Sequence, residues 1–383
     1  MNRKAGSLAL ALALGGCSWF GGPDVEPPAE LVEFDPTAAI TEVWSADIGK
    51  GPDRRFLRLA PVQHGDTLYV VDIKGSVRAL AQANGKERWR TDLGLEITGG
   101  VGFGDGLVLV ASRKGVVVAL DANQGGELWR AQATSEVLAP PAVGSGVVVV
   151  QSVDGKLTGL EGVTGKRLWI LERSEPALSL RGTAAPVVLS DVVLSGFASG
   201  KIVAANIKSG QLLWEIPVAQ PQGRSEIERL IDVDVPVLVS GRILLAAAYQ
   251  GKIVAVNLES GRLLWSRELS TYSALAADAD NVYVSDVRGH VVALDLRSGS
   301  TVWKQEKLAR RRLSAPAVTG NAVAVADFDG YVHWLAREDG SFLARARIAN
   351  AAVLAAPIAD GATLYVSAQN GNLAALRLGP RLP

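Results

Sequence analysis

The stretch Gly251-Lys-Ile-Val-Ala-Val-Asn-Leu-Glu-Ser-Gly-Arg-Leu-Leu-Trp265 contains the pattern that decides the fold. A glycine precedes an alternating apolar run, a polar turn with Gly261 follows, and a second apolar run ends in tryptophan. Alternation with a period of two predicts a half-buried β-strand over residues 253–258. Gly261 can adopt the positive φ of a tight hairpin, and Trp265 offers a large apolar surface to a neighbouring sheet. The stretch therefore predicts two strands joined by a hairpin.

The same pattern recurs along the whole chain. Its hairpin-tip glycines are Gly75, Gly115, Gly155, Gly200, Gly251, Gly289, Gly330 and Gly371, at spacings of 40, 40, 45, 51, 38, 41 and 41 residues. Its closing tryptophans are Trp89, Trp129, Trp169, Trp214, Trp265 and Trp303, and the seventh copy has Ala344 in that place. A period near 40 that is built of strands and hairpins is typical of a β-propeller with one four-stranded blade per repeat.

The two ends of the chain are predicted to share one blade. The last repeat, residues 361–378, ends before any fourth strand, whereas residues 40–48 resemble a fourth strand with no blade before it. Pairing the two would close the ring and remove its unpaired edges. We therefore expect an all-β fold, an eight-bladed β-propeller of four-stranded antiparallel blades over residues 41–383, closed by the N-terminal strand completing the last blade.

The N-terminus has the features of a secretory signal. Arg3 and Lys4 precede a short apolar run that could not span a bilayer as a helix. Cys17, the single cysteine, follows small residues as in a bacterial lipobox, although an ordinary signal with a chance cysteine would look similar. We expect a lipoprotein signal peptide over residues 1–16, and a lipidated Cys17 with a flexible tether over residues 17–40. Ser18, by resemblance to sorted bacterial lipoproteins, favours the outer membrane over retention in the inner membrane. We therefore expect lipid anchoring at the periplasmic face of the outer membrane.

The composition narrows the function classes. The 39 basic residues balance 39 acidic ones, and removal of Arg3 and Lys4 with a signal leaves 37 against 39, a net charge of −2. This gives no support for a nucleic-acid partner. A single cysteine excludes a disulfide or a cysteine-based metal site within one chain. Neither a metal nor a cofactor is predicted. The tryptophans from Trp44 onward are interpreted as core, with Trp334 either between blades or lining the channel.

Two links between blades are longer than the repeat requires, and departures from a repeat usually carry its function. One runs from Trp169 to Pro186 and the other from Trp214 to Pro236. Both join a fourth strand to the next first strand, so they are expected on one face, beside each other and beside the tips at Gly200 and Gly251. Their exposed leucines, an arginine and two aspartates suit protein recognition, although an elongated strand and turn caps would explain them too.

Two further charged motifs allow more than one interpretation. Asp232-Val-Asp234 lacks the glycine and glutamate that a Ca²⁺ loop needs at the required spacing. Arg310, Arg311 and Arg312 lie in a third link on the same face. They could bind an acidic partner or lipid headgroups, or form a solvated charge run.

Taken together, Cys17, the propeller repeat, Leu178-Ser-Leu-Arg-Gly182 and Asp232-Val-Asp234 resemble the BamB family, the lipoprotein subunits of the β-barrel assembly machinery in Gram-negative outer membranes. The resemblance implies a non-catalytic scaffold without cofactor that binds the periplasmic POTRA domains of BamA. The implied contact residues are Leu178, Leu180, Arg181, Asp232 and Asp234. It also implies transient binding of unfolded outer-membrane proteins, for which strand pairing with an outer blade edge is one possible mode.

Two other classes stay open on the sequence. Quinoprotein dehydrogenases share the tryptophan repeat, but their quinone site resembles a stack on a Cys-Cys disulfide with Ca²⁺ nearby, and this chain has one cysteine. No catalytic triad or carboxylate pair is indicated. A lipoprotein propeller that binds a small ligand or another envelope protein would differ in not depending on Leu178, Arg181 and Asp234.

Overall fold

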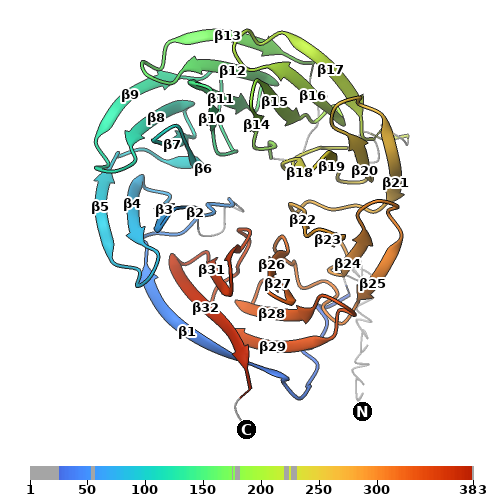
Figure 1. Ribbon diagram of the computed structural model, residues 1–383. Coiled ribbons are helices and arrows are strands. Elements are labelled where there is room, and N and C mark those ends of the chain that lie inside the picture. Colours follow the sequence, from blue (N-terminus) through green and yellow to red (C-terminus); the bar gives the residue numbers. More distant parts are fainter. Residues whose placement is uncertain are drawn as a thin grey trace, which may run out of the picture.

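The computed structural model describes residues 26–52, 57–174, 176, 182–219, 224–225 and 231–381. The strands within them form eight antiparallel sheets of four strands each, and Figure 1 shows these sheets as blades around a ring. The predicted eight-bladed propeller is confirmed. No helix in the described part of the chain is long and apolar enough to cross a membrane.

In blades one to seven the four strands follow one another from the centre of the ring outward (Figure 1). Blades one to four comprise β2 (Val62–His64), β3 (Thr67–Val71), β4 (Ser76–Ala81) and β5 (Glu87–Asp92); β6 (Ile97–Gly104), β7 (Leu107–Ser112), β8 (Val116–Asp121) and β9 (Glu127–Gln132); β10 (Ala142–Gly144), β11 (Val147–Ser152), β12 (Lys156–Glu161) and β13 (Arg167–Glu172); and β14 (Val187–Leu189), β15 (Val192–Gly196), β16 (Lys201–Asn206) and β17 (Leu212–Pro217). Blades five to eight comprise β18 (Leu238–Ser240), β19 (Ile243–Ala247), β20 (Lys252–Asn257) and β21 (Leu263–Glu268); β22 (Ala276–Ala277), β23 (Asn281–Ser285), β24 (Val291–Asp295) and β25 (Thr301–Gln305); β26 (Ala317–Thr319), β27 (Ala322–Ala326), β28 (Tyr331–Ala336) and β29 (Phe342–Arg347); and β30 (Ile358–Asp360), β31 (Thr363–Ser367), β32 (Asn372–Pro380) and β1 (Ala38–Asp47).

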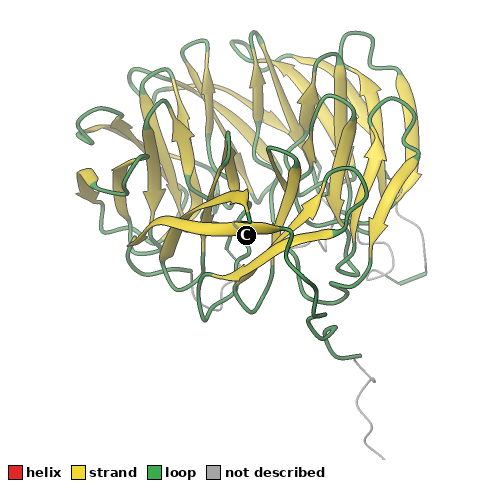
Figure 2. Cartoon of the chain, turned by 60° about the horizontal axis from the view of Figure 1, so that its bottom comes forward, coloured by secondary structure: helices red, strands yellow, loops and turns green. Residues whose placement is uncertain are grey.

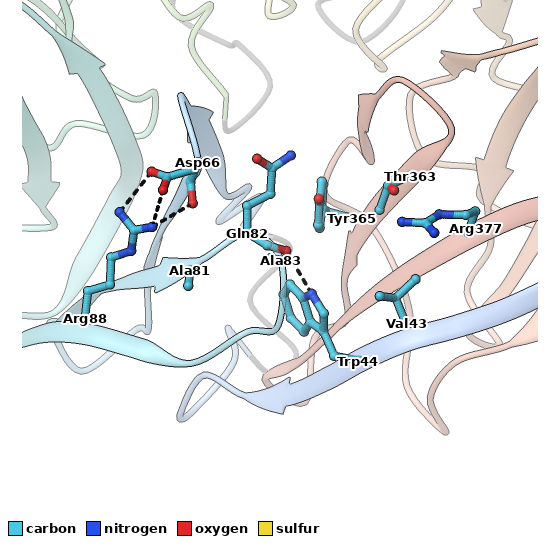
Figure 3. A pocket seen from close by; sticks show the side chains of 10 residues that line it. All are labelled: Val43, Trp44, Asp66, Ala81, Gln82, Ala83, Arg88, Thr363, Tyr365 and Arg377. Atoms are coloured by element: carbon cyan, nitrogen blue, oxygen red, sulfur yellow. Dashed lines mark hydrogen bonds and ion pairs between the residues drawn. The ribbon is translucent and has the colours of Figure 1, made fainter.

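The eighth blade joins the two ends of the chain. β1 pairs antiparallel with β32, from Ala38 opposite Pro380 to Asp47 opposite Asn372, so the N-terminal strand is the outer strand of the last blade. The Trp44 indole then crosses to the first blade, where its Nε1 donates a hydrogen bond to the Gln82 carbonyl oxygen at 2.9 Å (Figure 3). The ring is therefore closed by hydrogen bonds within the eighth blade and between the eighth and first blades.

The strands are buried more completely than their alternation predicts. On β20 the side chains from Ile253 to Val256 are all buried, with exposed fractions of 0–3%. The prediction of a half-buried strand over residues 253–258 is therefore wrong. Each blade packs face to face against two neighbouring blades, so both faces of its inner strands are removed from solvent. The outer strands stay largely exposed, as in β21, where Trp265 is buried and the other five residues are exposed.

One tryptophan–glycine contact repeats between successive blades. The Trp169 Nε1 donates to the Ile207 carbonyl oxygen at 2.8 Å, and the Trp169 ring covers Gly210 in the same turn of the next blade. An added Cβ at Gly210 would lie 2.6 Å from that ring. The same pair recurs as Trp44 with Gly85, Trp89 with Gly125, Trp129 with Gly165, Trp265 with Gly299 and Trp303 with Gly340. These tryptophans are therefore structural, as predicted.

Two junctions lack this contact, for different reasons. Trp214 stays half-buried, and a Cβ added to Gly261 would meet only Ile216, at 3.7 Å, among the described residues. Ala344 replaces tryptophan before the eighth blade, because that blade takes its fourth strand from the N-terminus and has no hairpin turn there to be covered. Trp334 is fully buried in the core between blades seven and eight, one of the two positions expected for it.

Residues 26–37 lie against the seventh blade. The Ala29 amide donates to the Ala309 carbonyl oxygen at 2.9 Å and the Thr37 amide to the Leu343 carbonyl oxygen at 3.0 Å. The Phe34 ring stacks on Phe342 with their centroids 5.2 Å apart. The described part of the expected tether is thus in contact with the propeller, and Cys17 lies outside the described residues.

Candidate functional site

The strand order gives the ring two distinct faces, with loops at both ends of the strands (Figure 2). Turns between the second and third strands lie on the same face as the links from a fourth strand to the next first strand, and we call this the link face. Turns between first and second strands and between third and fourth strands lie on the opposite face, the hairpin face. Both long links and the three arginines therefore belong to the link face.

The two long links meet, as predicted from topology. An added Cβ at Gly182, in the first link, would lie 2.6 Å from the Asp234 Oδ2 in the second. Ala219, in the second link, lies between the tips that flank it, with its carbonyl oxygen at Gly200 and its Cβ at Gly251. The described ends of the two links and the two tips thus form one continuous surface.

The predicted site residues have different environments. Asp232 is fully buried, and its carbonyl oxygen accepts a hydrogen bond from the Tyr249 amide at 2.8 Å. Asp234 is half-buried, and burial raises the pKa of its carboxyl to about 7, although the charge of Arg58 acts in the opposite direction. The remaining three predicted contact residues, Leu178, Leu180 and Arg181, lie outside the described residues.

The three consecutive arginines point to three different environments, because Arg310 and Arg312 both adopt a positive φ, of 61° and 48°. Arg310 forms an ion pair with Glu26 at 2.9 Å and donates to the Pro27 carbonyl oxygen at 2.6 Å. Arg311 is only 4% exposed. Arg312 is exposed at a cavity near the ring axis. The interpretation as a solvated charge run is therefore wrong for Arg311.

Arg311 belongs to a buried polar network that holds the N-terminal segment. Its Nε donates to the Asp327 Oδ2 at 2.7 Å and its Nη2 to the Asp329 Oδ2 at 2.8 Å. Its Nη1 donates to the Ala29 carbonyl oxygen at 3.0 Å. The Asp327 Oδ2 also accepts from the His333 Nε2 at 3.0 Å. The Asp327 Oδ1 accepts from the backbone amides of Asp329 and Tyr331, so both oxygens of this buried carboxylate have donors.

A cavity of about 270 Å³ opens where the links of several blades converge on the ring axis. It is lined by Arg58, Tyr272, Ser273, Arg312, Leu313 and Leu354, and we call it the channel-mouth cavity. No sequence motif predicts it, because the links that form it are far apart in the chain. The sequence does contain one indication of the cavity, which is the position of its two arginines. Arg58 and Arg312 each precede a leucine and an Ala-Pro pair at the entry to a first strand.

The described residues show no centre for metal chemistry. In them, no group of three or more histidine, cysteine, aspartate or glutamate side chains is placed to hold a metal ion.

A second cavity, of about 250 Å³, lies on the hairpin face between the eighth and first blades, where Arg88 forms an ion pair with Asp66 at 2.6 Å (Figure 3). This cavity marks the closure of the ring.

Comparison with known proteins identifies a family whose members match nearly the whole chain. The model of the family described as outer membrane protein assembly factor BamB matches residues 30–94, 73–305 and 288–379. The outer membrane protein assembly factor BamB of Pseudomonas aeruginosa is 49% identical, over 97% of this chain and 98% of its own length. The protein of the same name from Bordetella pertussis is 38% identical over 98% of this chain and 97% of its own.

Solved structures give the same assignment. The crystal structure of BamB from Moraxella catarrhalis superposes with a TM-score of 0.81 at 30% identity, covering 88% of this chain and all of that one. A quinohemoprotein alcohol dehydrogenase from Comamonas testosteroni reaches a TM-score of 0.71 over 90% of this chain and 77% of its own, but at 14% identity it shares the fold alone. The chain belongs to the family of the outer membrane protein assembly factor BamB.

Proposed function

We propose that this chain is a non-catalytic scaffold for the assembly of outer-membrane proteins. In this proposal residues 1–16 are a signal peptide, and Cys17 is lipidated and anchors the protein to the outer membrane on its periplasmic side. The propeller binds the periplasmic POTRA domains of BamA. The proposal is supported by the family and by the lipobox at Cys17, since an acylated cysteine with more than one chain gives stable anchoring. Labelling with palmitate that Cys17→Ser abolishes would test the anchor.

The observation that carries the proposal is the meeting of the two long links on the link face. Leu178, Leu180 and Arg181 immediately precede Gly182, which packs against Asp234 with no room for a side chain between them. Leucines beside an arginine are suited to a buried contact with a charged rim. We assign Leu178, Leu180, Arg181 and Asp234 to direct contact. Asp232 is assigned to holding the second link in place, because it is fully buried and bridges to Tyr249.

The test is a titration of the purified POTRA region of the cognate BamA against this chain. Arg181→Glu and Leu180→Ala should each weaken binding by about tenfold or more, as expected for interface anchors. Arg262→Glu and Leu128→Ala are matched controls, because both residues are exposed and neither lies in the long links. Unchanged circular dichroism should accompany every variant. No binding by the wild type would overturn the proposal, and equal binding by all four variants would place the contact elsewhere.

Transient binding of unfolded outer-membrane proteins is proposed to use the outer strands. Within the described sheets these strands have one unpaired edge each, which can pair with an extended segment. Five consecutive outer strands also expose an aliphatic residue directly before the tryptophan position, with exposed fractions of 43–52%: Leu128, Leu168, Leu213, Leu264 and Val302. Such side chains would contact the apolar face of a paired β-strand.

Photo-crosslinking tests this second role. A crosslinker at Leu213 or Leu264 should capture an unfolded outer-membrane protein, and the same crosslinker at Val163, which is 84% exposed in the turn between β12 and β13, should not. Equal capture at all three positions would mean that the outer edges have no special part in binding.

A further inference from the structure

The channel-mouth cavity contains two guanidinium groups that form no hydrogen bond or ion pair with a described side chain. Arg58 comes from the link before β2 and Arg312 from the link before β26, and both side chains are exposed. In the described part of the chain neither guanidinium forms a hydrogen bond or an ion pair. The other two arginines of the Arg310–Arg312 run have such a partner: Arg310 binds Glu26 and Arg311 binds Asp327. Unpaired arginines that face a cavity are groups to which an anion can bind.

The two arginines line the same cavity. The Arg58 guanidinium carbon lies 5.9 Å from the centroid of the Tyr272 ring, which belongs to the link before β22. Burial raises the pKa of the Tyr272 hydroxyl, whereas the charges of both Arg58 and Arg312 lower it, so the charges of two arginines from different links act on the same hydroxyl. The Tyr272 hydroxyl is an additional donor for an anion between them.

The rest of the wall limits the charge and the kind of ligand. Leu313 and Leu354 make part of the wall apolar, and Asp234 is close enough to Arg58 for each to influence the pKa of the other. A carboxyl beside the site disfavours a multiply charged anion such as phosphate, because like charges repel. A single carboxylate on an aliphatic chain satisfies both the arginines and the apolar wall. The volume of about 270 Å³ accommodates one such side chain.

We propose that Arg58 and Arg312, with Tyr272, form a carboxylate-binding site at the channel mouth, which takes an acidic side chain of a bound polypeptide. The site is independent of the proposed role in outer-membrane assembly, because it depends only on the chemistry of the cavity. It lies on the link face, so an acidic residue of any protein that covers the two long links is within its reach.

The test uses the full chain labelled with ¹³C on its tyrosine rings. The chain has 6 tyrosines, so Tyr272→Phe identifies the Tyr272 signal by its disappearance. The probe is N-acetylglutamic acid α-amide, which has one carboxylate. N-acetylglutamine amide is its neutral counterpart, and inorganic phosphate represents a multiply charged anion. A saturable shift of the Tyr272 signal with the glutamate probe is expected, and no saturable shift with the glutamine probe.

The variants show whether the two arginines are responsible. Arg58→Gln and Arg312→Gln should each weaken the glutamate probe by about tenfold or more, since each removes one charge-assisted hydrogen bond. Arg262→Gln, an exposed arginine on the hairpin face, should leave binding unchanged. An absent shift, an equal shift with the glutamine probe, or binding that survives both arginine variants would overturn the site. Tighter binding of phosphate than of glutamate would overturn the assignment to a carboxylate.

Discussion

The indole of Trp169 lies directly on Gly210 of the next blade, with 2.6 Å between its Cδ2 and the position that a Cβ of residue 210 would occupy. Gly210 has a φ of 69°, a left-handed conformation that favours glycine, and the ring above it leaves no room for a side chain. Glycine is therefore needed at this position for two separate reasons. Trp214 and Gly261 occupy the equivalent positions at the following junction, where the ring does not reach the glycine. The chain therefore contains one junction with the indole–glycine contact and an equivalent junction without it, and the two can be compared.

Gly210→Ala is expected to destabilise the protein more than Gly261→Ala. Both glycines adopt nearly the same φ, 69° and 67°, so both substitutions carry the cost of a left-handed alanine, about 1–2 kcal/mol. Gly210→Ala adds an overlap with Trp169, for which overpacking costs about 1–3 kcal/mol more. The difference in the free energy of unfolding, measured with urea at a single fixed pH, should therefore be at least about 1 kcal/mol. Equal losses for the two variants would show that the indole contact is not limiting.

Removal of residues 38–47 should open the ring. β1 provides the whole outer strand of the eighth blade, and Trp44 within it is only 9% exposed. Without it, β32 would present an unpaired edge, which favours association between chains. We expect a lower melting temperature and aggregation in light scattering that increases with protein concentration. A chain lacking only residues 1–25 is the control, and a soluble monomer with an unchanged melting temperature after removal of residues 38–47 would contradict the prediction.

Asp234 should make the protein less stable as the pH rises. The pKa of its carboxyl is about 7 in the folded chain against an ordinary value of 3.8, so between these two pH values the folded state binds more protons than the unfolded state. Stability contributed by the protonated carboxyl is present at low pH and is lost as the pH rises through about 7. Asp234→Asn stays neutral at every pH and avoids this loss.

The advantage of Asp234→Asn over the wild type in the free energy of unfolding should accordingly increase by about 1–2 kcal/mol between about pH 5 and about pH 8. Urea unfolding across this range measures the difference. Asp280→Asn, at an exposed aspartate on the hairpin face, is the matched control and should show no such trend. A difference that shrinks as the pH rises would contradict the assigned direction of the pKa.

Most of the fold could be predicted from the repeat, because tip glycines and closing tryptophans are local signals. Some local departures from the repeat could not be predicted from its pattern. At the fifth hairpin tip Gln250, with a φ of 48°, adopts the left-handed conformation in place of Gly251. Trp214 has the same sequence signal as Trp169 and yet misses its glycine. Whether an indole reaches the next blade depends on how two blades pack, and no single repeat contains that information.

The candidate site could be predicted only in part. The neighbouring positions of the two long links followed from topology, and the contact between Gly182 and Asp234 confirms them. The channel-mouth cavity could not be predicted, because Arg58, Tyr272 and Arg312 are brought together only by ring closure. Residues 26–37 resemble a tether in composition, but their partners, such as Phe342, lie near the other end of the chain.

The network around His333 predicts a pH-dependent attachment of that N-terminal segment. His333 is fully buried; its Nε2 donates to the Asp327 Oδ2 and its Nδ1 accepts from the Arg345 Nε at 3.1 Å. Arg345 in turn donates to the Val32 carbonyl oxygen at 3.0 Å, while Arg311 donates to the Ala29 carbonyl oxygen. A proton on the His333 Nδ1 would oppose the Arg345 guanidinium and disturb the hydrogen bonds that hold the segment.

Acidification should therefore release residues 26–37. Burial lowers the pKa of His333 below 6.5, and the hydrogen bond and charge of Asp327 offset this only in part. The unfolded state then binds more protons than the folded state, so stability is complete above about pH 6.5 and falls as the pH decreases below it. His333→Gln, which cannot take up a proton, should flatten the fall in melting temperature between about pH 6.5 and about pH 5, and should keep the amide of Ala29 protected from hydrogen exchange across that range. His64→Gln, at an exposed histidine in the first blade, should behave like the wild type. Equal pH dependence in the wild type and His333→Gln would show that this network does not sense pH.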